Sequence, residues 1–197
     1  MTEEEVNAKL EEKNQELFFN KLKIDLDKCY KNLIVVINNI LDAFQKDMEL
    51  RVYEISFDAE SLLSRDDINN RIKPFFDKMR EYCNKTNESN LKLLIASIES
   101  KNLEKYGNDL DTYGTNFVNG ISTLYLEGID LLIKSVTVEM DAYSIIRMNK
   151  ILKELIYNHF IERLSSTIID TNSIIKNNVT NNTSYLENMN KSTLKAY

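Results

Sequence analysis

The chain has 197 residues, enough for one sizeable core, and a single domain is the default at this length. Its net charge is −6 and no run of basic residues is present, which argues against nucleic acid or an anionic membrane as partner. With only four Gly and one Pro, the composition favours a few long helices over a turn-rich fold. We therefore expect an all-α protein: an elongated, antiparallel, coiled-coil-like bundle of about four long helices.

The first predicted helix covers Glu3–Leu63, a stretch without Gly or Pro whose acidic start suits a helix N-terminus. Its apolar residues recur at intervals of four and three, apart from one extra interval of four near Asp47. One helix through the whole stretch would be on the order of 90 Å long. A bend or break near Asp47 is the alternative.

The second predicted helix covers Asp67–Tyr106. Ser64 and Asp67 have the spacing of a capping box, so the helix is expected to begin beside them. Pro74 lies a turn or two inside this boundary. It is either an interior residue or the first residue of a helix, in which case residues 65–73 form a separate short turn.

Two further boundaries concern polar or flexible stretches. Residues 84–90 are polar and form either a loop or the solvated part of one long helix; the apolar pattern resumes directly afterwards, which favours continuity. Gly107 is expected to end the second helix as a left-handed C-cap, with Asn108 or Asp109 starting the next helix.

The third predicted helix, Asp109–Asp141, carries the most regular pattern, and we expect the other helices to pack against it. Gly114 and Gly128 would let neighbouring backbones approach closely. A fourth helix is predicted over Ala142–Ile175, and residues 141–145 are either a junction or continuous helix. The intervals alternate between four and three through Leu110, Gly114, Phe117, Ile121, Leu124, Gly128, Leu131, Ser135, Val138, Ala142 and Ile145.

The predicted helical domain covers residues 1–175. Residues 176–197 are rich in Asn, Ser and Thr and are predicted to be a frayed or disordered tail, although the apolar spacing also allows the last helix to extend into them. The N-terminus lacks the features of a signal peptide and no stretch is long enough for a membrane span. We expect a soluble, cytoplasmic protein, with leaderless export left open.

The sequence offers little for catalysis. His159 is the only histidine, and a helical metal site usually needs a second one, so no metal site is predicted. Cys29 and Cys83 lie in apolar helical stretches and are expected to pack rather than react. Glycine-rich phosphate-binding motifs are absent from the sequence. We predict neither a cofactor nor an enzyme activity.

The predicted function is protein–protein interaction or scaffolding, because long helices offer grooves to a partner helix. If the first helix overhangs the others, the region around Leu10, Leu17 and Phe18 is available to a protein partner or to a second copy of the chain. Tyr113 and Tyr125 are further candidates, since Tyr buries a ring and keeps a polar tip.

The alternative function is a bundle that rearranges to bind or insert into membranes, with residues 112–138 as the inserting segment. These residues carry Gly, Ser and Thr among apolar residues and only three charged ones: Glu127, Asp130 and Lys134. This composition resembles in a general way the inserting hairpins of helical pore-forming toxins. A tightly packed core helix accounts for the same composition and is the favoured interpretation.

Overall fold

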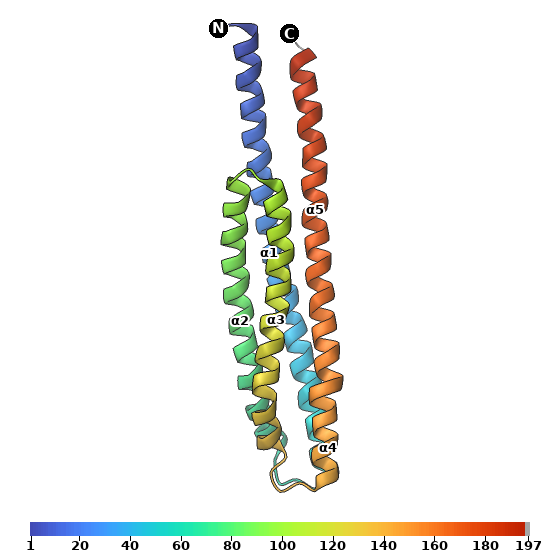
Figure 1. The fold of residues 1–197 in the computed structure, drawn as a ribbon. Helices are drawn as coiled ribbons and strands as arrows, with labels where there is room; N and C mark the ends of the chain where they lie inside the picture. Colours follow the sequence, from blue (N-terminus) through green and yellow to red (C-terminus); the bar gives the residue numbers. More distant parts are fainter. Residues whose placement is uncertain (196–197) are drawn as a thin grey trace.

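A computed structural model shows an elongated, antiparallel all-α bundle, which confirms the predicted fold class (Figure 1). The structure describes the backbone of residues 1–195 and the side chains of residues 1–191. The described chain forms α1 (Glu3–Asp58), α2 (Arg65–Glu99), α3 (Leu103–Val136) and a last long helix made of α4 (Ala142–Lys150), a π-helical turn η1 (Ile151–Ile156) and α5 (Tyr157–Lys195).

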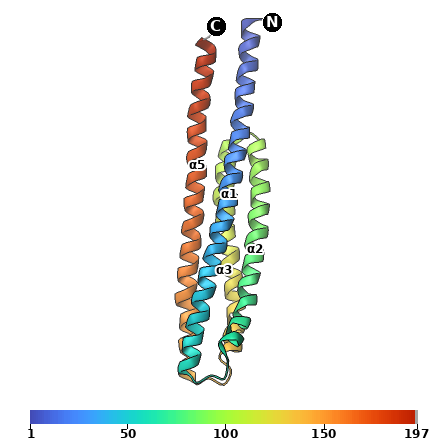
Figure 2. The ribbon, with the colours of Figure 1, turned by 180° about the vertical axis from the view of Figure 1, so that it is seen from behind.

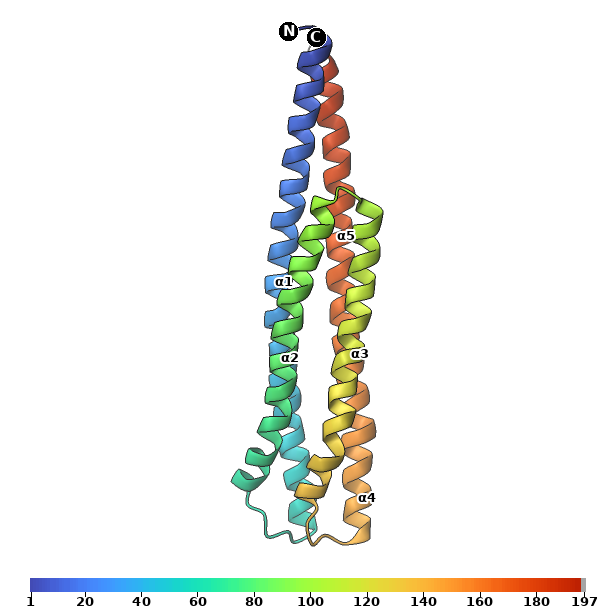
Figure 3. The ribbon, with the colours of Figure 1, turned by 60° about the vertical axis from the view of Figure 1, so that its left-hand side comes forward.

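The helices form a four-helix part and a two-helix extension. α1 and α5 lie side by side along the rod, and the α2–α3 hairpin covers them over most of its length (Figures 1 and 2). Beyond the turn of that hairpin, α1 and α5 continue alone towards the two termini (Figure 3). The other two loops, residues 59–64 and 137–141, lie together at the opposite end, which we call the loop end.

α1 is a single helix of 56 residues, as predicted, and the alternative of a break near Asp47 does not apply. Thr2 and Glu5 form a capping box at its start, where the side chain of each residue binds the other's backbone N–H. The helix ends at Asp58 instead of Leu63, because Glu60 adopts the left-handed conformation with φ 55° and turns the chain.

α2 begins at the predicted capping box of Ser64 and Asp67. Pro74 lies inside the helix, so the first of the two alternatives applies and residues 65–73 are not a separate turn. An interior Pro removes one backbone hydrogen bond and favours a kink. Pro74 is exposed, where water can bind the freed carbonyl group, and the first turns of α2 diverge from the rest of the helix (Figure 3).

The turn between α2 and α3 lies earlier than predicted. Residues 84–90 are helical, as favoured, but the helix ends at Glu99 and Lys101 reverses the chain with φ 61°. Asn102 caps α3 by accepting a hydrogen bond from the Lys105 N–H at 3.0 Å. The predicted turn at Gly107 is therefore wrong: Gly107 is a helical residue with open space beside it.

The predicted seam of α3 is correct only in its first half. Gly114 and Gly128 are closely packed, but against side chains instead of the predicted neighbouring backbones: a Cβ there would meet the Asn172 side chain at 2.9 Å and the Phe75 ring at 3.1 Å. After Ile121 the buried residues are Tyr125, Ile129, Leu132 and Val136, whereas the predicted Leu131, Val138 and Ala142 are exposed. Two successive intervals of four, at 121–125 and 125–129, shift the buried face.

The last helix begins at Ala142, where Asp141 caps it by accepting from the Ser144 N–H. The predicted junction at residues 141–145 is therefore the helix start. The predicted end at Ile175 is wrong, because α5 continues to Lys195. The alternative of an extended last helix applies instead. Residues 196–197 of the predicted tail lie outside the described residues.

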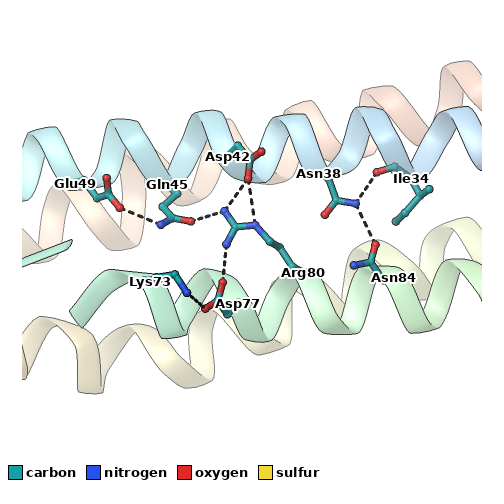
Figure 4. Close-up of polar contacts among 9 residues, drawn as sticks. All are labelled: Ile34, Asn38, Asp42, Gln45, Glu49, Lys73, Asp77, Arg80 and Asn84. Carbon is teal, nitrogen blue, oxygen red and sulfur yellow. Dashed lines mark hydrogen bonds and ion pairs between the residues drawn. The ribbon is translucent and has the colours of Figure 1, made fainter. Parts of the chain in front are cut away.

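Polar side chains fix the register between the helices. Arg80 on α2 donates to Asp42 of α1 at 2.8 Å and also contacts Gln45, while Asn38 donates to Asn84 at 3.0 Å (Figure 4). In the extension, Asn14 of α1 donates to Asn190 of α5 at 3.1 Å. Paired polar groups at a helix interface penalise sliding, because a shifted register would leave them unpartnered.

Candidate interaction surfaces

Tyr125, a predicted interaction residue, is a core residue. It is fully buried, its ring lies 5.1 Å from that of Phe75, and its hydroxyl donates to the Leu152 carbonyl at 2.6 Å. That carbonyl belongs to the π-helical turn, where the backbone is locally widened. In this conformation Tyr125 cannot contact a partner, so its assignment to an interaction surface is not supported by its position.

The other predicted interaction residues lie in or near the extension. Phe18 is buried against α5, whereas Leu10 and Tyr113 are half-buried. Leu17 is exposed and lines a groove between α1 and α5 together with Ile24. The overhang of α1 is thus covered by α5 on one side and open on the other.

The polar groups singled out for chemistry do not assemble. His159 lines a shallow surface groove with Phe44 and Arg51. Burial raises the pKa of the Cys83 thiol to about 12, and burial together with the charge of Asp25 raises the pKa of Cys29. Among the described residues, no three His, Cys, Asp or Glu side chains lie close enough to hold a metal ion.

Five apolar side chains are exposed at the loop end. Leu62 is 92% exposed, Tyr143 75% and Phe57 72%, and Val138 and Ile146 are also exposed. These five residues come from the ends of α1 and α4 and from both loops, which lie together at this end (Figure 1). We call them the loop-end apolar residues. Exposed apolar residues gathered at one site are typical of interaction surfaces.

The loop end is held in shape by several contacts. Arg147 of α4 binds Asp58 of α1 at 2.8 Å and so joins the two helices that flank the loops. The Arg65 guanidinium lies 5.4 Å from the centre of the Tyr53 ring. Asp141 and the Ser64 capping box fix the following helix starts. The apolar side chains are therefore presented on an ordered surface.

The loop end is also acidic. Residues 57–67 contain four acidic side chains and one Arg, and residues 137–147 contain two acidic side chains and one Arg. The two segments carry net charges of −3 and −1, which is −4 of the chain's total of −6. A partner surface with Lys or Arg around an apolar centre would match this charge.

The predicted inserting segment, residues 112–138, lies almost entirely in α3. Ile121, Tyr125 and Ile129 of this segment are buried in the core, so its insertion would first require the bundle to open. Within residues 1–195, no helix has the combination of length and apolar character needed for a membrane span.

Comparison with known proteins gives no relative. No family model matches the chain, and neither the curated proteins nor the solved structures contain a significant match.

Proposed function

We propose that the protein is a non-catalytic interaction module that binds a protein partner through the loop end. The observation that supports this proposal is the exposure of Phe57, Leu62 and Tyr143 on an ordered surface. Aromatic and large aliphatic side chains are the residues that most often dominate binding energy when a partner covers them.

The charge of the loop end defines the chemistry of the partner. Its net charge of −4 favours a protein surface that places Lys or Arg around an apolar centre. Association of two loop ends would bring like charges together, which is unfavourable. A second copy bound loop end to loop end is therefore not the proposed partner.

The proposal is tested with a variant in which Phe57, Leu62 and Tyr143 are each replaced by Ser. The matched control replaces Leu93 and Leu126, which are exposed on α2 and α3, by Ser. Proteins are captured from the native cell extract with wild type and both variants, and binding of each purified candidate is then measured by calorimetry. We expect a direct partner that binds wild type and control, and that loses at least about tenfold in affinity for the loop-end variant.

Two results would contradict the proposal. One is a purified partner whose affinity is the same for the loop-end variant and wild type. The other is a partner that the Leu93 and Leu126 control weakens as much as the loop-end variant does. Circular dichroism of each variant shows whether its helical content is intact.

A further inference from the structure

A stripe of exposed residues runs along the side of α1 that faces solvent. Its members are spaced at intervals of 4, 3, 4, 3 and 4, and all are exposed. Apolar and basic side chains share it. Its six residues are Leu17, Lys21, Ile24, Lys28, Lys31 and Val35, which we call the outer stripe. This spacing keeps them on one face of the helix over about 27 Å at 1.5 Å per residue.

α5 widens the outer stripe near the extension. A groove of about 340 Å³ between the two helices is lined by Leu17, Lys21 and Ile24 on one side and by Tyr185 and Leu186 on the other. Tyr185 is exposed and presents an aromatic ring beside the apolar residues of α1. The surface therefore spans two helices and combines Lys, aliphatic and aromatic side chains.

The local charge is opposite to that of the whole chain. Residues 17–35 of α1 carry four Lys and two Asp, and residues 171–186 of α5 carry one Lys and no acidic residue. These segments have a net charge of +3 in a chain of −6. Glu99 and Asp111 of the neighbouring helices bind Lys23 and Lys176 and reduce the net charge of this region to +1. Lys31 binds Asp27 at 2.8 Å, whereas Lys21 and Lys28 form no ion pair with the residues that the structure describes.

We propose that the outer stripe docks onto an anionic lipid surface. Leu17, Ile24 and Tyr185 enter the boundary between head groups and acyl chains, and the Lys ammonium groups contact lipid phosphates and carboxylates. Lys suits this position because its alkyl stem covers apolar surface while its charge stays in the polar layer. The rod then lies along the membrane without crossing it.

A docked partner helix is less favourable at this position. Half of the outer stripe is Lys, and a helix packed against it would remove Lys21 and Lys28, which form no ion pair with the residues that the structure describes, from water. Each buried ammonium group would need its own carboxylate partner. A lipid surface imposes no such one-to-one pairing, because its charge is distributed over many head groups.

The test is co-sedimentation of the full chain with phosphatidylcholine vesicles, with and without phosphatidylserine. We expect binding only when phosphatidylserine is present, and weaker binding as salt is added. Replacing Lys21, Lys28 and Lys31 by Gln should reduce binding about 100-fold, which is about fivefold per charge. The control replaces Lys85 and Lys92, exposed on α2, by Gln and should bind like wild type.

A second variant tests the apolar contribution. Leu17→Ser with Ile24→Ser should weaken vesicle binding about tenfold or more, whereas the exposed Leu93→Ser on α2 should not. The loop-end variant with Ser at Phe57, Leu62 and Tyr143 should bind vesicles like wild type. Vesicle binding and partner binding are thus measured on different surfaces, and the failure of one proposal leaves the other standing.

Several results would overturn the inference: absence of binding to phosphatidylserine vesicles, equal binding to neutral vesicles, or binding that the Gln substitutions do not change. An acidic protein that binds the outer stripe with the same Lys dependence, in the absence of vesicle binding, would assign this surface to a protein instead.

Discussion

α1 and α5 accompany each other along the rod, yet their two halves lie in different environments. In the four-helix part Leu41 and Met48 of α1 are completely buried. In the extension none of residues 1–17 is buried, although all of them are described. The same two helices are therefore stabilised by a shared core in one region and mainly by each other in the other. Long helices gain most of their stability from packing, so the extension should open first.

The largest expected difference comes from matched Leu→Ala substitutions in the two regions. Leu41→Ala should destabilise the protein by about 2–5 kcal/mol, because it leaves a cavity in a closed core. Leu10→Ala should cost only about 0.5 kcal/mol, since Leu10 is half-exposed. Urea unfolding followed by circular dichroism measures both. Equal losses would show that the extension is as well packed as the four-helix part.

Alkaline pH should act on buried tyrosines. Burial is the main cause that raises the pKa of Tyr30, Tyr106 and Tyr125, so each stays protonated in the folded protein. The unfolded tyrosines ionise near pH 10. The free energy of unfolding therefore does not depend on these tyrosines well below pH 10. Above pH 10 it falls as pH rises, because only the unfolded tyrosines ionise, and the fall reaches about 1.4 kcal/mol per tyrosine at pH 11.

Urea unfolding at pH 8 and pH 11 tests this expectation, with Tyr125→Phe as the control. The substitution should lower stability at pH 8 by about 1 kcal/mol, because the Leu152 carbonyl loses its donor. The variant should also lose less stability than wild type between pH 8 and pH 11, because it has one buried tyrosine fewer. A loss of the same size in the variant would assign the pH effect to other groups.

Removing an Asn contact should also cost more stability in the four-helix part than in the extension. Asn87 is buried and donates to the Tyr30 carbonyl at 3.2 Å, so Asn87→Ala should cost about 1–2 kcal/mol. Asn14→Ala removes the half-buried contact to Asn190 and should change global stability by less than about 0.5 kcal/mol. Hydrogen exchange should nevertheless show faster opening of the extension in the Asn14 variant.

A small stabilising effect is expected at the border of the two regions, in the α2–α3 turn. Lys101 has φ 61°, a conformation that Gly adopts without steric cost. Lys101→Gly should stabilise the protein by about 0.5 kcal/mol, the relief of strain exceeding the added entropy of the unfolded chain. A lower midpoint in thermal or urea unfolding would show that the Lys101 side chain itself stabilises the turn.

Much of the architecture follows from local signals in the sequence. The capping residue Ser64 marks the start of α2, and the absence of Gly and Pro marks the long α1. Gly107 misleads because a glycine is allowed in a helix when its neighbours, here Tyr106 and Leu110, are needed in the core. The true turn uses Lys101, which has no turn preference of its own.

The shifted face of α3 depends on contacts between distant segments. Leu124 and Tyr125 are both apolar enough for the core, and the regular alternation of intervals of four and three predicts that Leu124 is the buried one. The structure buries Tyr125, whose hydroxyl finds the Leu152 carbonyl 27 residues further along the chain. Such a partner is visible only after the helices have been placed.

The candidate surfaces were predictable to different degrees. The predicted overhang of the first helix leads to Leu17. It does not lead to the Lys residues around Leu17, because they are separated in sequence and align only on the helix surface. Their spacing at Lys21, Lys28 and Lys31 was a usable signal. The loop end joins Leu62 to Tyr143, which are 81 positions apart, and no local pattern connects them.

The π-helical turn at Ile151–Ile156 determines how α4 is rotated relative to α5. A turn of this kind accommodates about one more residue than an α-helical turn does, and each α-helical residue rotates the chain by about 100°. Converting this turn to α-helix at constant length would swing Tyr143 and Ile146 by about 100° around the rod, whereas deleting one residue in the same conversion would leave their azimuth unchanged. This short segment thus determines the angle around the rod axis between the loop-end residues of α4 and the outer stripe, which we propose faces the membrane.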